Sequence, residues 1–227
     1  MVSGNGSNRA IVEVSHVIES GMITYKGLPA PVVCDYLTRE ESRKFYAPGT
    51  EFQIGKVEMV SNTGTYIDSP FHRYPHGDDL AALSASSILD LEAIVVRVPR
   101  RQREIGPEVF SSIDVSGKAI LVHTGWDAHW RTEQYFENHP FLTPQSAELL
   151  ARRGATLVGI DSLNVDDTND GTRPVHTTLL SAGIPIVEHL CNLANVSDRG
   201  ARFFAPVLKI KSCGTFPVRA FAITGRE

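Results

Sequence analysis

Strand-like and helix-like segments alternate through the second half of the chain, and this alternation constrains the fold more than any other feature. Residues 93–98 and 119–122 are short runs rich in β-branched side chains, as in buried strands. Residues 143–154 then resemble a capped helix, with Thr first, Pro in the first turn and Gly at the exit. Residues 157–161 and 184–188 are again strand-like and flank a short helical segment over residues 176–183. The alternation predicts βαβ units and a partly parallel, buried sheet.

The two ends of the chain add strands of a different character. Residues 11–18 alternate apolar and polar side chains, as a half-buried strand does, and irregular chain follows them. Residues 52–61 alternate as well, but their phase changes at Gly55 and Lys56, which predicts a β-bulge there. The runs 203–210 and 218–224 predict two further strands. We therefore expect an α/β fold in which the sheet has mixed strand directions.

Composition places this fold in one domain and excludes one class of partner. The chain has 227 residues, enough for one large core, so we expect a flexible tail over residues 1–10 and a single domain over 11–227. Its 22 basic and 26 acidic residues give a net charge of −4, which offers no positive surface for a polyphosphate backbone. A nucleic-acid partner is therefore not expected.

The same composition gives an expected cellular location. The first ten residues lack the apolar core of a signal peptide, and no later run approaches the roughly 18 apolar residues that span a bilayer. Cys34, Cys191 and Cys213 are far apart and form no CxxC pair, so we expect reduced thiols. These features predict a cytoplasmic protein without membrane contact.

The densest polar cluster is the segment NTGTYIDSPFH, residues 62–72, directly after a predicted strand. Gly64 allows backbone conformations closed to other residues and Pro70 fixes the chain, so a stiff loop would hold Asp68 and His72. Such a loop suits preorganised chemistry. A polar turn with a capping Asp and a surface His would show the same residues, and the spacing alone leaves both interpretations open.

This segment resembles the signature His-x-Gly-Thr-His-x-Asp-x-Pro-x-His of the cyclase family, which includes kynurenine formamidase-like and isatin hydrolase-like metal-dependent hydrolases. Gly64, Thr65, Asp68, Pro70 and His72 match it. The resemblance extends over nearly the whole chain, through Ser15-His16, Gly21-Met22, Tyr25 to Pro29, Thr124 to Trp126, Gly159 to Asp161, His176 and Ile186 to Glu188.

The resemblance implies a single domain with a mixed sheet in the swivelling β/β/α-like architecture of the family. It also implies a divalent metal, zinc or manganese, bound by the signature together with a later His and Glu, which are His176 and Glu188 here. The last histidine of the signature moves protons in the family, and His72 would take that role. Family members commonly form dimers or tetramers, so a homodimer or homotetramer is expected.

The chain departs from the signature at Asn62 and Tyr66, where the family has its two histidine ligands. A neutral amide is a poor zinc ligand, and a phenol with a pKa of about 10 binds strongly only after losing its proton. Asp68, His176 and Glu188 could still form a three-ligand metal site with a position open for water. Alternatively the site works without metal, and Asn62 and Tyr66 polarise a carbonyl as hydrogen-bond donors.

The sequence thus predicts a small-molecule hydrolase that acts on a carbon–nitrogen bond of an amide, formamide or lactam. His72 is the candidate acid–base group, with Tyr66 and Asn62 beside it, and Trp126 and Tyr25 are candidate substrate contacts. Two alternatives stay open. One is a metal-free cyclase or dehydratase that uses the same pocket, and the other is a catalytically silent relative that binds a small molecule.

Overall fold

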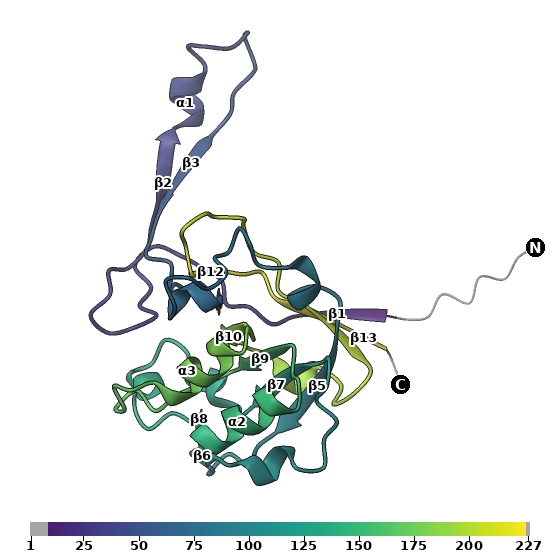
Figure 1. Ribbon diagram of the computed structural model, residues 1–227. Helices are drawn as coiled ribbons and strands as arrows, with labels where there is room; N and C mark the ends of the chain where they lie inside the picture. Colours follow the sequence, from purple (N-terminus) through teal and green to yellow (C-terminus); the bar gives the residue numbers. More distant parts are fainter. Residues whose placement is uncertain (1–8, 226–227) are drawn as a thin grey trace, which may run out of the picture.

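The computed structural model describes residues 9–225, and a curled sheet runs through the middle of this part of the chain (Figure 1). Nine strands form the sheet within the described residues. In the order in which they pair, they are β1 (Arg9–Glu13), β13 (Phe221–Gly225), β11 (Ala201–Phe204), β5 (Leu91–Arg97), β7 (Ala119–His123), β9 (Leu157–Ile160), β10 (Ile186–Glu188), β4 (Tyr66–Asp68) and β12 (Thr215–Pro217).

The centre of the sheet is parallel and both of its flanks are antiparallel. Strands β5, β7, β9 and β10 pair in parallel, whereas β4 and β12 on one side and β11, β13 and β1 on the other pair antiparallel. Nearly every residue of β7 and β9 is buried, as expected for parallel strands covered on both faces. The mixed α/β sheet in a single domain confirms the fold class expected from the sequence.

Side chains of β7 alternate between two apolar cores, one on each face of the sheet. Ile120 and Val122 belong to the core that includes the helices, and Ala119 and Leu121 belong to the opposite core. The period of two follows from the strand geometry, in which successive side chains point to opposite faces. The sheet is therefore the middle layer of the domain.

Two helices cover one face of the sheet, α2 (Pro144–Arg152) and α3 (Pro174–Ser181) (Figure 1). Thr143 caps α2 by accepting a hydrogen bond from the Ser146 amide, and Pro144 occupies the first turn, as the sequence predicted. The helix expected over 176–183 begins two residues earlier, at Pro174. Within the described residues no helix has the length and apolar character to cross a membrane.

A hairpin arm, residues 32–58, projects from the body of the protein (Figure 1). It consists of β2 (Val32–Leu37), the short helix α1 (Arg39–Ser42) and β3 (Ile54–Glu58). The sequence predicted irregular chain where β2 lies, and it placed a bulge at Gly55 and Lys56. The register instead shifts in β2, between Asp35 and Leu37. All residues of β3 are exposed. The alternation of its apolar side chains therefore does not indicate a face that packs on the core.

The remaining elements are short, and the ends of several predicted strands differ from the structure. Strand β1 ends at Glu13 rather than at residue 18, β11 ends at Phe204 rather than at 210, and β12 was not predicted. Residues 1–8 of the predicted tail lie outside the described residues, whereas Arg9 and Ala10 belong to β1. The short elements are η1 (Pro70–His72), η2 (Ala85–Ser87), β6 (Glu104–Ile105), η3 (Pro107–Phe110), η4 (Trp126–His129), η5 (Glu133–Phe136), β8 (Phe141–Leu142) and η6 (Leu193–Asn195).

Candidate functional site

A cavity of about 320 Å³ lies where β4, β10 and the start of α3 meet. Six of the residues proposed from the sequence line it: Tyr25, Asn62, Tyr66, His72, His176 and Glu188. Strand pairing assembles them, because β4 and β10 place Tyr66 opposite Glu188, and β4 and β12 place Asp68 opposite Thr215. A seventh proposed residue, Asp68, is fully buried beside the cavity. The sheet therefore brings together residues that are far apart in the sequence.

Trp126 is the one proposed site residue outside this group. It is not among the residues that line the cavity, and its Nε1 donates a hydrogen bond to the carbonyl oxygen of Tyr135. The loop before it is fixed by Asp161, whose carboxylate accepts bonds from the amides of Thr124 and Gly125. Trp126 thus anchors a neighbouring loop in this structure.

The signature segment reaches the cavity through one positive-φ glycine and one tight turn. Gly64 has φ 65°, and its amide donates to Thr24 Oγ1 at 2.8 Å. Strand β4 follows, and Pro70 then starts the 3-10 turn that ends at His72. The stiff loop expected from the sequence is therefore a short strand followed by a turn, with Asp68 on the strand and His72 on the turn.

Asp68 is a buried carboxylate with one free oxygen. Its Oδ1 accepts a hydrogen bond from Thr215 Oγ1. Within residues 9–225, no hydrogen-bond donor meets its Oδ2. The nearest cationic group is the imidazole of His176, whose Nε2 lies 3.6 Å from this oxygen. A buried oxygen without a donor is a place where a cation is favoured.

Thr215 also sets the tautomer of His72. Its Oγ1 lies 2.8 Å from His72 Nδ1. Since the single hydroxyl proton goes to Asp68, Thr215 can only accept from Nδ1–H, which leaves a lone pair on His72 Nε2. The side chain of His72 is 36% exposed at the cavity, so Nε2 is open to a ligand. Thr215 had no signal in the sequence, because only the β12–β4 pairing brings it here.

Glu188 is fully buried and both of its oxygens accept hydrogen bonds. Oε1 accepts from the Val165 amide at 2.7 Å, and Oε2 accepts from Tyr66 Oη at 2.6 Å and from Asn164 Nδ2 at 3.2 Å. Burial raises the pKa of Glu188. Burial and the charge of Glu188 raise the pKa of Tyr66, so the phenol keeps its proton. Tyr66 is therefore a hydrogen-bond donor here and not an anionic ligand.

Tyr25 completes this hydrogen-bonded group. Its hydroxyl donates to the carbonyl oxygen of Leu163 at 2.7 Å and lies 2.9 Å from Asn164 Nδ2, which can donate to it. The same hydroxyl lies 3.3 Å from Glu188 Oε2. Tyr25 had been proposed as a substrate contact, and the structure places its ring at the cavity with its hydroxyl held by the protein.

His176 lies at the start of α3 and faces three carboxylates. Its Nδ1 is 2.6 Å from Asp166 Oδ2, and its Nε2 is 3.6 Å from Asp68 Oδ2 and 3.7 Å from Glu188 Oε1. Burial alone lowers the pKa of His176, but the charge of Glu188, the hydrogen bond with Asp166 and the charge of Asp68 outweigh burial and raise it. Positive charge at this imidazole is therefore strongly favoured.

Asp166 lies in an acidic loop after β9 and has two tasks. It caps α3, since its carboxylate accepts bonds from the amides of Val175 and His176. It also orients the His176 ring through Nδ1. The capping function has a sequence signal, whereas the contact with the ring depends on the fold.

Asp68, His72 and His176 can hold a metal ion, because each offers one ligand atom and these atoms lie within 4.8 Å of one another. One carboxylate and two imidazoles form a donor set that suits zinc and other divalent transition ions. The free Oδ2 of Asp68 supports the fit, since a cation there would satisfy it. His72 thus joins the ligand candidates, whereas Glu188, proposed from the sequence, is held by donors on both oxygens.

The pairing of Thr215 with Asp68 and His72 makes a testable prediction. In metal-depleted protein, Thr215→Val should lower the free energy of unfolding by about 1–3 kcal/mol, because it leaves the buried Asp68 without its donor. Urea denaturation measures this difference. Thr215→Ser keeps the hydroxyl and should recover most of the loss. Equal stability of the Val variant and the native protein would contradict the assignment.

Known proteins resemble this chain in sequence and in fold. The family described as putative cyclase matches residues 12–167. Over 175 residues the chain is 31% identical to a kynurenine formamidase from Geobacillus thermodenitrificans, covering 74% of this chain and 78% of the relative. Over 174 residues it is 30% identical to a kynurenine formamidase from Bacillus cereus, again covering 74% and 78% of the two chains.

Solved structures agree at the level of the fold. A potential metal-dependent hydrolase with cyclase activity superposes with a TM-score of 0.78 at 23% identity, covering 96% of this chain and 99% of that one. Isatin hydrolase A from Labrenzia aggregata superposes with a TM-score of 0.79 at 20% identity, covering 96% and 94% of the two chains. The sequence match and the shared fold together show that this chain belongs to the putative cyclase family.

Proposed function

We propose that this protein hydrolyses a carbon–nitrogen bond in a small amide, formamide or lactam. The observation that carries the proposal is the group of Asp68, His72 and His176 beside a cavity of about 320 Å³, a size that suits a small molecule. The relatives named kynurenine formamidase support an amide as the substrate. The substituted signature positions, Asn62 and Tyr66, keep their side chains at the same cavity.

His72 is the side chain that meets the substrate in this proposal. Its free Nε2 lone pair accepts a proton from the attacking water and returns it to the leaving nitrogen. A metal would bind the same Nε2 atom. His72 therefore serves either as the proton carrier or as a metal ligand at any one time. A divalent ion held by Asp68, His72 and His176 would lower the pKa of a bound water and polarise the substrate carbonyl.

Asn62 and Tyr66 have different tasks in this proposal. Tyr66 donates a hydrogen bond to Glu188, so it holds that carboxylate in place. Within the described residues the Nδ2 of Asn62 has no hydrogen-bond partner, and Asn62 lines the cavity. Its amide is therefore the free donor for the oxygen of a scissile carbonyl, where negative charge develops in the transition state.

Removal of the His72 imidazole tests the proposed reaction. With formanilide as the substrate and aniline release as the readout, His72→Ala should lower kcat by about 10²- to 10⁴-fold. His76→Ala is a matched control, since His76 is an exposed histidine four residues further on and does not line the cavity. Full activity of His72→Ala would remove His72 from the mechanism. If the native protein cleaves none of a panel of formamides, acetamides and lactams, the silent binding protein becomes the better hypothesis.

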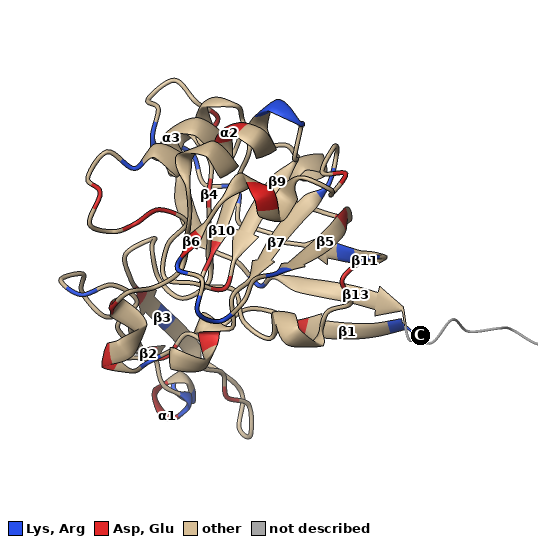
Figure 2. Cartoon of the chain, turned by 90° about the horizontal axis from the view of Figure 1, so that it is seen from below, with Lys and Arg blue, Asp and Glu red and all other residues tan. Residues whose placement is uncertain are grey.

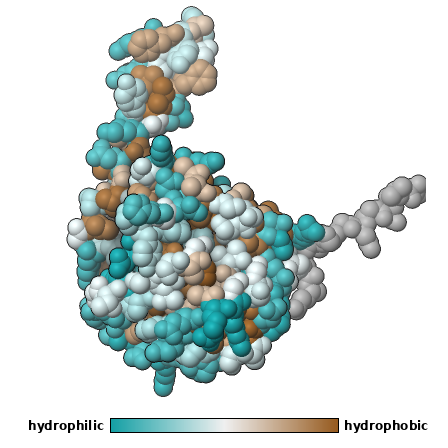
Figure 3. All heavy atoms as spheres, in the orientation of Figure 1, coloured by the Kyte–Doolittle hydropathy of each residue, from teal (hydrophilic) through white to brown (hydrophobic). Residues whose placement is uncertain are grey.

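We also propose that the protein is a homodimer or homotetramer in which the hairpin arm packs against a second copy. Eight large apolar side chains are exposed on the arm: Val32, Val33, Tyr36, Phe45, Tyr46, Phe52, Ile54 and Val57. Figure 3 shows apolar residues on the projecting arm, interspersed with hydrophilic ones. Large exposed apolar side chains gathered on one projecting element are typical of an interface between proteins.

Sedimentation velocity tests this arrangement. The native protein should sediment as a multiple of its 24.9 kDa chain mass. Tyr36→Asp combined with Phe45→Asp should shift it toward the monomer, because two charges would be buried in the interface. Leu208→Asp is the control, since Leu208 is 63% exposed but lies outside the arm. A monomeric native protein would contradict the proposal.

We also infer that the protein binds no nucleic acid and works in the cytoplasm. Lys and Arg are interspersed with Asp and Glu over the chain, and this distribution favours no nucleic-acid surface (Figure 2). Cys34, Cys191 and Cys213 are free thiols. Free thiols are typical of a reducing compartment, which supports the cytoplasm as the place where the protein works.

A further inference from the structure

We propose that Arg73 and Arg173 form an anion-binding site at the cavity, and that the substrate is an amide that carries a carboxylate. This inference rests on the proposed hydrolysis and specifies its substrate class. Both arginines line the same cavity as His72 and His176. They flank these histidines in the sequence, Arg73 directly after His72 and Arg173 three residues before His176. The short segments that carry the histidines therefore also carry the arginines of the proposed anion site.

Both guanidinium groups lack a carboxylate partner in the described part of the chain. Among residues 9–225, no Asp or Glu oxygen lies within 4.0 Å of a side-chain nitrogen of Arg73 or Arg173. Six other arginines do pair with a carboxylate: Arg43, Arg97, Arg103, Arg131, Arg202 and Arg219. A guanidinium at a cavity without a protein partner keeps its planar set of donors for a ligand carboxylate.

Arg173 is held in place by its backbone and by one hydrogen bond. It is half-buried, and its Nη1 donates to the carbonyl oxygen of Asp167 at 3.2 Å. Its backbone has φ 50° and ψ 59°, in the left-handed region that an arginine rarely adopts. The nearby Asp170 does not take its guanidinium, since Asp170 Oδ1 accepts from the amide and hydroxyl of Thr172. The remaining donors of Arg173 are available at the cavity.

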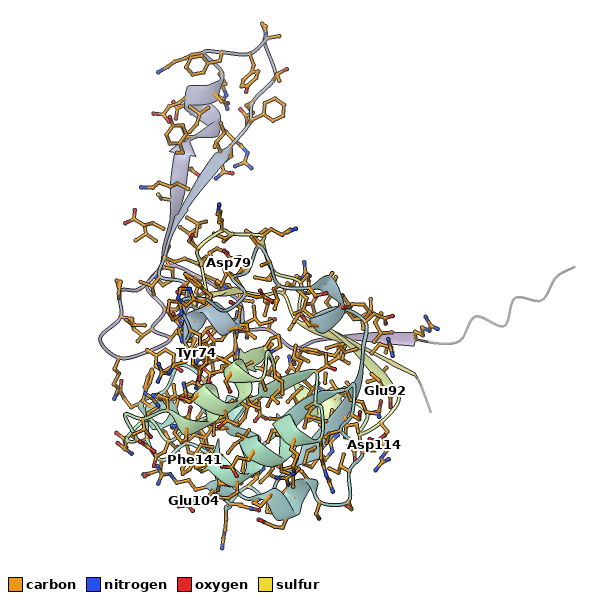
Figure 4. The ribbon with its side chains drawn as sticks, viewed as in Figure 1. Tyr74, Asp79, Glu92, Glu104, Asp114 and Phe141 are labelled. Carbon is orange, nitrogen blue, oxygen red and sulfur yellow. The ribbon has the colours of Figure 1, made fainter. Side chains whose placement is uncertain are left out.

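Arg73 contacts the helix that Arg173 precedes, α3, through Thr177. Its Nε donates to Thr177 Oγ1 at 3.4 Å, and its guanidinium carbon lies 5.6 Å from the centre of the Tyr74 ring. Tyr74, labelled in Figure 4, donates its hydroxyl proton to the carbonyl oxygen of Thr177 at 2.9 Å. These contacts use Nε and one face of the guanidinium and leave both Nη groups for a ligand.

The charges of the cavity give a substrate one favourable orientation. Asp68 and Glu188 are buried at the inner end, whereas Arg73 is exposed and Arg173 half-buried. Positive charge at His176 compensates these buried carboxylates, so the positive charge still without a carboxylate partner lies at the two arginines, where a ligand carboxylate would be attracted. An anionic amide would therefore bind with its carboxylate at the arginines and its carbonyl toward His72. Leu28 and Tyr25 add apolar surface to the lining of the cavity.

Binding of benzoate and benzamide, two probes of the same shape, tests the site without relying on turnover. Isothermal titration calorimetry on the full chain should show benzoate binding at least tenfold more tightly than benzamide. Arg73→Gln and Arg173→Gln should each reduce this preference by about tenfold or more, because a charged hydrogen-bond donor is lost. Arg152→Gln is the control, since Arg152 is an exposed arginine at the end of α2, away from the cavity. It should keep the native preference.

Three results would overturn the anion site: no detectable benzoate binding, equal affinity for the two probes, or a preference that survives both Gln substitutions. Arg73→Gln is decisive if Arg173→Gln misfolds, since Arg73 is exposed and has an ordinary backbone conformation. Kinetics with 4-formamidobenzoate and formanilide separate the two proposals. If neither compound is cleaved while benzoate is preferred, only the proposed reaction fails. If both are cleaved equally and benzoate is not preferred, only the anion site fails.

Discussion

The contact of the buried His176 imidazole with three carboxylates is the interaction on which the site depends. Asp166 holds its Nδ1 at 2.6 Å, while Asp68 and Glu188 lie 3.6 and 3.7 Å from its Nε2. Burying a carboxylate costs several kcal/mol unless positive charge and hydrogen bonds compensate it. A proton or a divalent cation at Nε2 supplies this charge. The β4–β10 register and the cap of α3 place these groups together. The fold around the cavity therefore brings the buried carboxylates next to the imidazole that compensates their charge.

Tyr66 changes what Glu188 can do in this chain. The cyclase signature has a histidine at that position, whereas the phenol of Tyr66 donates to Glu188 at 2.6 Å. With Val165 and Asn164, it satisfies both oxygens of the carboxylate. The ligand set supported by the geometry is therefore Asp68, His72 and His176. This metal-compatible group includes His72, whose side chain is 36% exposed.

The sequence predicted what local pattern determines and missed what strand register determines. Residues 119–122 and 143–154 were recognisable because burial and capping leave a local pattern. The β2 strand was missed because neither face of the arm packs on the core. Thr215 was missed because its contact with Asp68 spans 147 residues and exists only through strand pairing. The family resemblance supplied His176 and Glu188, which periodicity alone could not have selected.

Anomalous diffraction from crystals soaked with Zn²⁺ or Mn²⁺ tests the central claim about this site most directly. We expect one ordered ion per chain, with Asp68 Oδ2, His72 Nε2 and His176 Nε2 as its protein ligands. An ion bound by Glu188 without His72 would contradict the assignment of the ligands. No ordered ion at saturating metal would contradict the metal site itself and leave His176 to compensate the carboxylates as a cation.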